Sequence, residues 1–197
     1  MKVYIKEHPF GAGKWIYKGY ESAWQSLGYE TQFYSDLLEI NEQDCQIMAI
    51  DHDIRTKKHV EILSSAHRTY LFVQPHAFPA PWGSHPNFVS QVPKNLISDI
   101  SSSESVYKWS FADAHKTSFY REWGNVHYVP LAYDSENYKY LDEDKYSFDV
   151  CYVGGWANNG FDEKKKIIIK YLSAFKESGL KCGFAVNKGI SHEQENR

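Results

Sequence analysis

The sequence predicts an α/β fold in which the strands of a parallel sheet alternate with helices. Three observations lead to this prediction. Short apolar, β-rich runs alternate with segments of helical periodicity along most of the chain. The predicted strand QIMAI at 46–50 is apolar at every position after Gln46, as expected of a strand that a parallel sheet buries on both faces. Gly28, Gly124 and Gly179 each follow a predicted helix, where a glycine commonly ends the helix.

The predicted strands are short and rich in Val, Ile, Tyr, Phe and Thr. The first is the run KVYIK, which precedes a loop that contains a proline and two glycines. In chain order, the predicted strands are 2–6, 31–34, 46–50, 69–73, 106–111, 126–131, 150–153 and 181–186.

The predicted helices lie between these strands and carry apolar residues at spacings of three and four. In the first helix, Tyr20, Trp24 and Leu27 share one face. Asp53 is expected to cap the second helix, because aspartate is a favoured N-cap residue. In chain order, the predicted helices are 16–27, 55–66, 113–123 and 162–177.

The chain is predicted to contain two Rossmann-like domains. Residues 134–147 are polar and acidic, which predicts a linker between a first domain at 1–133 and a second at 148–197. The motifs SAWQSLG and SAFKESG end corresponding helices, so both domains are expected to begin alike. Because an open α/β domain needs about 100 residues, we expect the second domain to be incomplete. Its uncovered sheet edge would favour self-association.

The composition argues against several classes of protein. The net charge is −3, with 22 basic and 25 acidic residues, so no basic surface for nucleic acid is expected. The sequence has no apolar run of membrane-spanning length and no signal-peptide core at its N-terminus. Three cysteines without a C-x-x-C pair favour a reducing compartment. We therefore expect a cytoplasmic protein.

Two glycine turns are candidate phosphate-binding sites. Gly11 and Gly13 follow the first strand, while Gly154 and Gly155 follow the strand at 150–153. Neither turn has the spacing of the dinucleotide fingerprint, and the second lacks the lysine of a P-loop. A glycine after a strand nevertheless lets the backbone approach a ligand near a helix N-terminus. The alternative is that both are ordinary turns between a strand and a helix.

Several histidines and one carboxylate follow predicted strands and are therefore candidate site residues. Asp51 and His52 follow the third strand, His76 follows the fourth, and His8 follows the first. A histidine in such a position is suited to act as a general base or to bind a sugar hydroxyl. Trp82, in the proline-rich segment 74–93, offers a ring for stacking on a sugar. The alternative is that these are ordinary loop residues. No residues with clear metal-ligand spacing accompany them, so no metal is expected.

Two motifs resemble those of a known family. VHYVPLAYD at 126–134 precedes the acidic linker, and YSFDVCYVGG at 146–155 follows it. In this order they resemble the two-domain GT-B glycosyltransferases, and among these the spore-maturation CgeB-like group. The resemblance implies transfer of a sugar from a nucleotide-diphosphate donor to an acceptor, without a cofactor or an obligatory metal. The family's donor-binding carboxylates lie late in its second domain, so we expect the donor half to be truncated here.

The resemblance also implies roles for the candidate residues. It assigns catalysis to His76 and His52, acceptor binding to His8, Asp51 and Trp82, and donor-phosphate binding to Gly11, Gly13, Gly154 and Gly155. Two alternatives stay open: a non-catalytic α/β binding or partner domain, and a nucleotide-sugar epimerase on the same fold.

Overall fold

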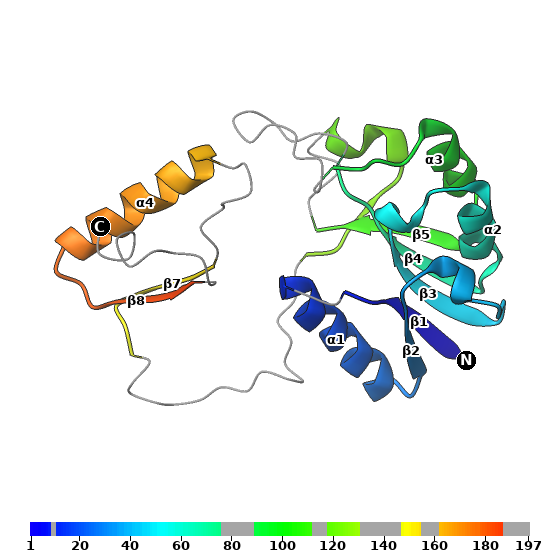
Figure 1. Cartoon of the computed structure of the whole chain (residues 1–197), viewed down its shortest axis with the longest axis horizontal. Coiled ribbons are helices and arrows are strands. Elements are labelled where there is room, and N and C mark those ends of the chain that lie inside the picture. Colours follow the sequence, from blue (N-terminus) through cyan, green and yellow to red (C-terminus); the bar gives the residue numbers. More distant parts are fainter. Residues whose placement is uncertain (9–10, 76–88, 112–117, 131–146, 155–161, 187–197) are drawn as a thin grey trace. The chain divides into compact units, whose positions relative to one another are not determined.

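The chain folds into two compact units (Figure 1). The first is built on a six-stranded sheet, and the second is a strand–helix–strand unit. Most of the predicted linker, 134–147, lies outside the described part of the chain. The computed structural model describes residues 1–8, 11–75, 89–111, 118–130, 147–154 and 162–186.

All neighbouring strands of the six-stranded sheet are parallel. This arrangement confirms the predicted α/β fold with a parallel sheet. The strands are β1 (Lys2–Lys6), β2 (Glu30–Tyr34), β3 (Cys45–Ile50), β4 (Arg68–Phe72), β5 (Val106–Ser110) and β6 (His127–Tyr128). Their spatial order is β2-β1-β3-β4-β5-β6, so β1 and β3 lie side by side.

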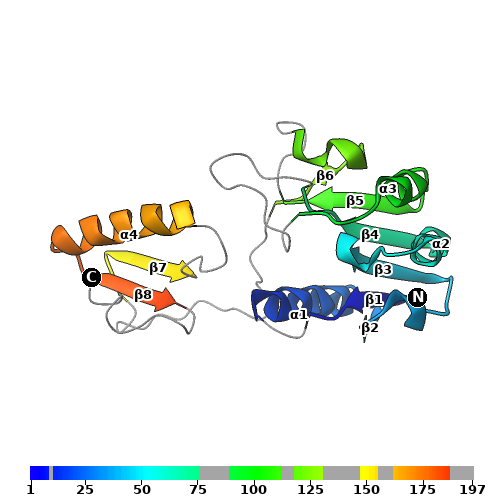
Figure 2. The same ribbon diagram turned by 45° about the horizontal axis from the view of Figure 1, so that its top comes forward.

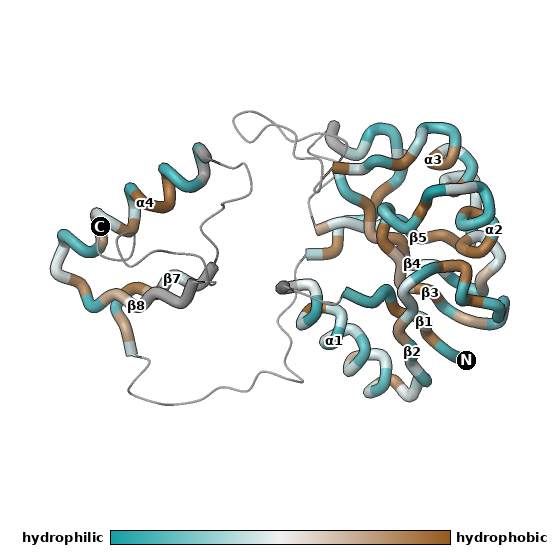
Figure 3. Tube along the Cα trace, in the orientation of Figure 1, coloured by the Kyte–Doolittle hydropathy of each residue, from teal (hydrophilic) through white to brown (hydrophobic). Residues whose placement is uncertain are grey.

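Helices cover the two faces of this sheet unequally. Helix α1 (Gly11–Ser26) lies on one face, while α2 (Lys57–Ser65) and α3 (Lys94–Ser101) lie on the other (Figures 1 and 2). The larger hydrophobic core forms between the sheet and α2 and α3, and includes Leu63 and Ile100, both 0% exposed. Figure 3 shows hydrophobic residues concentrated on the central strands, whereas much of α1 is hydrophilic.

The face of β4 and β5 that shares a side with α1 is aromatic. Parallel pairing places Tyr70 beside Tyr107 and Phe72 beside Trp109. The alternate residues of both strands, such as Leu71, belong to the buried core on the opposite face. In contrast, the side chain row that includes Tyr107 stays partly open, and Tyr107 itself is 38% exposed. Strands β4 and β5 are thus packed against the core on one face and only partly covered on the other.

The second unit matches the predicted strand–helix–strand pattern. Strands β7 (Val150–Gly154) and β8 (Cys182–Val186) are parallel and are joined by helix α4 (Asp162–Glu177). The Asp149 carboxylate accepts a hydrogen bond from the Lys181 backbone N–H at 2.8 Å, which fixes the start of both strands. The unit is therefore a βαβ unit, as expected for the start of a second Rossmann-like domain.

Two helices differ from the prediction. Helix α1 begins at Gly11 instead of residue 16, so the predicted glycine loop forms the first turn of the helix. Helix α3 was not predicted, although Leu96, Ile97 and Ile100 have helical spacing and are all buried. The segment 74–93 before α3 is rich in proline, which is typical of a loop. Its last residue, Pro93, is the N-cap of the helix, where proline is tolerated.

The last two elements of the first unit are described only in part. A 3₁₀ segment, η3 (Ser118–Trp123), occupies the end of the predicted helix 113–123 and is kinked at Tyr120. Residues 112–117 lie outside the described part. Within the described residues, strand β6 pairs with β5 at His127 and Tyr128, and the Val129 backbone N–H donates to the Ser110 carbonyl oxygen at 2.9 Å. The predicted strand covers 126–131, of which residue 131 lies outside the described part.

Candidate functional site

The first and third strands end at the topological switch point of the sheet. The chain leaves β1 through α1 toward β2, but leaves β3 through α2 toward β4 on the other side. Open α/β sheets bind ligands outside the carboxyl ends of the strands at such a point. We call the residues that gather here the switch-point residues: Lys6, His8, Asp51, His52 and Asp53.

Asp51 is a fully buried carboxylate, with 0% of its surface exposed. Its Oδ2 accepts a hydrogen bond from the Gln74 backbone N–H at 3.1 Å. Its Oδ1 has no hydrogen-bond partner among the described residues. Burial raises the pKa of Asp51, while nearby His52, the Gln74 N–H and the Ser90 hydroxyl oppose that rise. A buried carboxylate oxygen without a donor is costly, so Asp51 is suited to attract a positive charge or a proton.

His52 lies next to that oxygen and is one-third exposed. Its Nε2 lies 3.9 Å from Asp51 Oδ1 and 3.3 Å from the Val89 carbonyl oxygen. A carbonyl oxygen only accepts hydrogen bonds, so Nε2 carries the proton in the neutral ring. Nδ1 is then unprotonated and able to accept a proton. Nδ1 is thus the basic nitrogen, and the buried Asp51 carboxylate lies on the Nε2 side of the ring. Sites that activate a nucleophile commonly have such a base oriented by a third group.

Asp53 belongs to a different network, which joins the ends of three strands. Its Oδ1 lies 2.8 Å from Lys6 Nζ, and its Oδ2 accepts a hydrogen bond from the Tyr34 hydroxyl at 3.1 Å. Lys6 Nζ also donates to the Ser35 carbonyl oxygen at 2.6 Å. The predicted helix cap at Asp53 is therefore wrong, because α2 has Thr56 at its N-cap and Asp53 instead bridges β1, β2 and β3.

Tyr17 of α1 and Tyr34 of β2 lie near the carboxylates. Burial is the main cause that raises the pKa of Tyr17 above its usual range, and Tyr20 and the charges of Asp53 and Asp51 add to it. Burial and Asp53 likewise raise the pKa of Tyr34. Both phenols therefore remain neutral hydrogen-bond donors beside the switch-point residues.

His8 closes this group from the β1 side. Its ring stacks on Tyr17, with 5.7 Å between the ring centroids. A Cβ on Gly13 would lie 2.3 Å from His8 Nδ1, so only glycine allows the ring to approach the first turn of α1. Gly13 thus leaves room for the His8 ring, a structural role that was not predicted. Its role in phosphate binding stays a prediction.

The predicted site residues fall into three groups. His8, Asp51 and His52 come together at the switch point, with Gly11 and Gly13 in the adjoining first turn of α1. Gly154 ends β7 in the second unit. His76, Trp82 and Gly155 lie outside the described residues.

Four residues at the switch point were missed: Lys6, Tyr17, Tyr34 and Gln74. Lys6 is the last residue of β1. Because ligands bind at the carboxyl ends of parallel strands, its position in the sequence could have identified it as a site residue. Tyr17 and Tyr34 act through their hydroxyls, and tyrosines in apolar patterns are indistinguishable from core residues. Gln74 contributes only its backbone N–H, which leaves no trace in the sequence.

The described residues contain neither a metal cluster nor a membrane span. No three His, Cys, Asp or Glu side chains in the described ranges group in a way that could hold a metal ion. No described helix has the length and apolar character needed to cross a bilayer.

Comparison with known proteins finds no match: no family model, no curated protein and no solved structure corresponds to the chain. The resemblance to GT-B glycosyltransferases therefore stays a prediction.

Proposed function

We propose that this protein is a glycosyltransferase that moves a sugar from a nucleotide-diphosphate donor to an acceptor hydroxyl. The observation that carries the proposal is the Asp51–His52 pair at the switch point, in which Nε2 of His52 is held by the Val89 carbonyl oxygen at 3.3 Å. That contact leaves Nδ1 as the basic nitrogen. The motifs at 126–134 and 146–155 support the choice of glycosyl transfer over other base-catalysed reactions.

In the proposed reaction, Nδ1 of His52 takes the proton of the acceptor hydroxyl as its oxygen bonds to the anomeric carbon. The bond from that carbon to the diphosphate oxygen breaks, and the nucleoside diphosphate leaves with the electron pair. Asp51 stabilises the imidazolium that forms, because its Oδ1 lies 3.9 Å from Nε2. The neutral hydroxyls of Tyr17 and Tyr34 lie beside the carboxylates and keep the site polar.

The donor side of the proposal rests on the βαβ unit. Gly154 ends β7, and the 16-residue helix α4 begins at Asp162. A strand that ends in glycine and is followed by a helix N-terminus is a common phosphate-binding arrangement in α/β proteins. We assign the donor diphosphate to the Gly154–Gly155 motif of the sequence and the acceptor to the switch point.

The test is a donor titration by calorimetry with UDP- and GDP-sugars, followed by an assay for nucleoside diphosphate release with hydroxyl acceptors. Binding of one donor and acceptor-dependent release of its nucleotide would support the proposal. Conversion of the free nucleotide sugar without an acceptor would favour the epimerase. If neither UDP- nor GDP-sugars bind, the non-catalytic alternative replaces the enzyme.

Two variants distinguish the loss of the proposed general base from other effects of replacing a histidine. His52→Gln is expected to lower turnover about 10²-fold or more, because general bases contribute on that scale. His127→Gln, on the exposed strand β6, serves as the matched control and should leave turnover unchanged. Equal losses in the two variants would remove His52 from the mechanism.

A further inference from the structure

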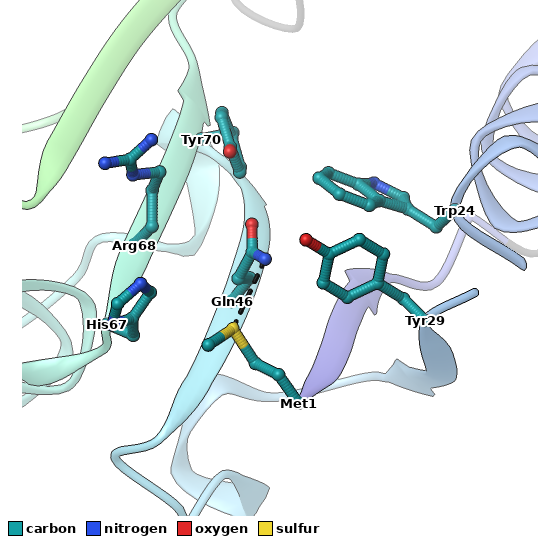
Figure 4. Close-up of a pocket in the computed structure, with 7 residues that line it drawn as sticks. All are labelled: Met1, Trp24, Tyr29, Gln46, His67, Arg68 and Tyr70. Carbon is teal, nitrogen blue, oxygen red and sulfur yellow. Dashed lines mark hydrogen bonds between the residues drawn. The ribbon is translucent and has the colours of Figure 1, made fainter. Parts of the chain in front are cut away.

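A cavity of about 210 Å³ lies at the opposite, amino end of the same sheet. Side chains from the starts of β3 and β4 line it, together with residues from the end of α1 and the turn that follows. In Figure 4, Gln46 stands in the middle, with Trp24 and Tyr29 on one side and His67 and Arg68 on the other. Because β3 runs from Gln46 to the switch point, the cavity and the switch-point residues lie at opposite ends of one strand.

Gln46 contributes a buried side-chain amide to this cavity. The residue is only 5% exposed. Its Nε2 donates to the Met1 thioether sulfur at 3.4 Å, and sulfur is a weak acceptor. Because the thioether is a poor partner, the Nε2 group is suited to a stronger acceptor supplied by a ligand.

The cavity is positively charged. Arg68 contributes a permanent guanidinium, which lies 4.7 Å from the centroid of the Tyr107 ring. No carboxylate in the described part of the chain forms an ion pair with Arg68, and no acidic residue is among those that line the cavity. The hydroxyls of Tyr29 and Tyr70 and the imidazole of His67 add hydrogen-bonding groups.

Aromatic rings form one continuous wall of the cavity. Trp24 packs edge-on against Tyr29, with 5.1 Å between centroids, and lies 5.7 Å from Tyr70. The indole N–H of Trp24 is directed to the Met48 sulfur at 2.9 Å, which fixes the ring. A rigid aromatic wall favours a ligand with a flat or apolar body.

We propose that this cavity binds a small organic anion, namely a single ring that carries a carboxylate or phosphate group. The guanidinium of Arg68 receives the oxyanion, the aromatic wall receives the ring, and the Gln46 amide receives a polar substituent. The volume is below the range of drug-sized pockets, which begins near 300 Å³, so the ligand is limited to about one ring. The site does not depend on the proposed glycosyl transfer.

Ligand-observed NMR titration of the full chain tests the proposal with four probes: benzoate, phenyl phosphate, benzyl alcohol and inorganic phosphate. A dissociation constant of about 1 mM or below for benzoate or phenyl phosphate is expected for ligands of this size. Whichever of these two binds more tightly identifies the oxyanion. Benzyl alcohol and inorganic phosphate should each bind at least tenfold more weakly, because each lacks one half of the recognised chemistry.

Arg68→Gln should weaken binding of the preferred probe at least tenfold, and Arg68→Lys should weaken it less. Arg55→Gln, at another exposed arginine, is the matched control and should bind as the unsubstituted protein does. Thermal unfolding of each variant shows whether the fold is retained. Binding of benzyl alcohol equal to that of benzoate, binding of inorganic phosphate equal to that of phenyl phosphate, or equal behaviour of Arg68→Gln and Arg55→Gln would each overturn the proposal. So would the absence of binding by both ring anions.

Discussion

Asp51 Oδ1 lies 3.9 Å from Nε2 of His52, and the Asp51 side chain is fully enclosed at the end of β3. A neutral His52 leaves this oxygen without a hydrogen bond from any described residue. The pair thus joins a buried carboxylate to a partly exposed imidazole at the end of β3. Four predictions concern Asp51, the strand ends around it, the start of α1 and a buried lysine of β5.

The first prediction is that Asp51→Asn lowers turnover without lowering stability. The amide keeps the shape of the side chain and an acceptor for the Gln74 N–H, but cannot stabilise a charged His52. Turnover should fall about 10²-fold. The melting temperature should be unchanged or higher, because a buried charge is removed.

The pH dependence of the same variant follows from linkage. Burial raises the pKa of Asp51 above its ordinary value of about 3.9, so the folded state holds the proton more tightly than the unfolded state. The resulting stabilisation is complete below about pH 3.9 and is lost as the pH rises through the folded-state pKa. The stability of Asp51→Asn relative to the unsubstituted protein should therefore increase between about pH 4 and about pH 7. Urea unfolding at both pH values measures this, and a constant difference would contradict it.

The second prediction concerns the buried ion pair of Lys6 and Asp53. Their side chains are 16% and 8% exposed, and Lys6→Met would leave Asp53 charged without this ion pair. Among the described residues, the Tyr34 hydroxyl is the hydrogen-bond partner that Asp53 would keep, so breaking this buried pair should lower the free energy of unfolding by about 3 kcal/mol. Urea unfolding is the measurement.

An exposed lysine pair supplies the control for this experiment. Lys58 and Glu61 are 3.2 Å apart with side chains that are 66% and 65% exposed. Lys58→Met should change the free energy of unfolding by less than about 0.5 kcal/mol. Similar effects of Lys6→Met and Lys58→Met would show that the Lys6–Asp53 pair does not hold the strand ends together.

The third prediction concerns Gly13→Ala. Alanine favours the helix by about 1 kcal/mol over glycine, but its Cβ would lie 2.3 Å from His8 Nδ1. The His8 ring must therefore leave its position on Tyr17, which NMR of the His8 imidazole detects directly. Gly28→Ala, at a φ of +84°, should instead cost about 1 kcal/mol of stability and leave the His8 signal in place. An unshifted His8 signal in Gly13→Ala would refute the packing argument.

The fourth prediction concerns Lys108, which is 8% exposed and donates a hydrogen bond to the Trp123 carbonyl oxygen at 2.7 Å. Burial lowers the pKa of Lys108, so the charged form is costly in the folded state. The stability of the unsubstituted protein should rise as the pH increases from the lowered folded-state pKa toward about 10.4. Lys108→Met removes both the buried charge and the hydrogen bond to Trp123, and only the first effect depends on pH. The stability of Lys108→Met relative to the unsubstituted protein should therefore fall as the pH rises from neutral toward about 10. Thermal unfolding across this range measures the difference, and a constant difference would contradict the assigned cause.

Much of the fold was predictable because it depends on local pattern. The apolar run in β3 and the periodicity of α4 identify buried strands and an amphipathic helix directly, and the predicted bounds of α4, Asp162–Glu177, agree with the structure. The start of α1 was not predictable, because Gly11 and Gly13 disfavour a helix locally. In the structure, Gly13 lies against the His8 ring in the first turn of the helix.

The candidate site was only partly predictable for a related reason. His8, Asp51 and His52 could be placed at one edge because the carboxyl ends of parallel strands meet there. The Lys6–Asp53–Tyr34 network depends on β1 lying between β2 and β3, and lateral strand order is not encoded in local periodicity. The cavity around Gln46 depends on the same order, since its wall combines the end of α1 with the starts of β3 and β4.

Strand β3 carries Gln46 in the cavity at one end and leads to Asp51 at the other. Five steps of about 3.3 Å separate these residues, so their Cα atoms are about 16 Å apart. Substitutions that far apart, with no shared partner, usually combine additively. The two ends of this strand can therefore be redesigned independently, one for ligand capture and the other for chemistry, within a single sheet.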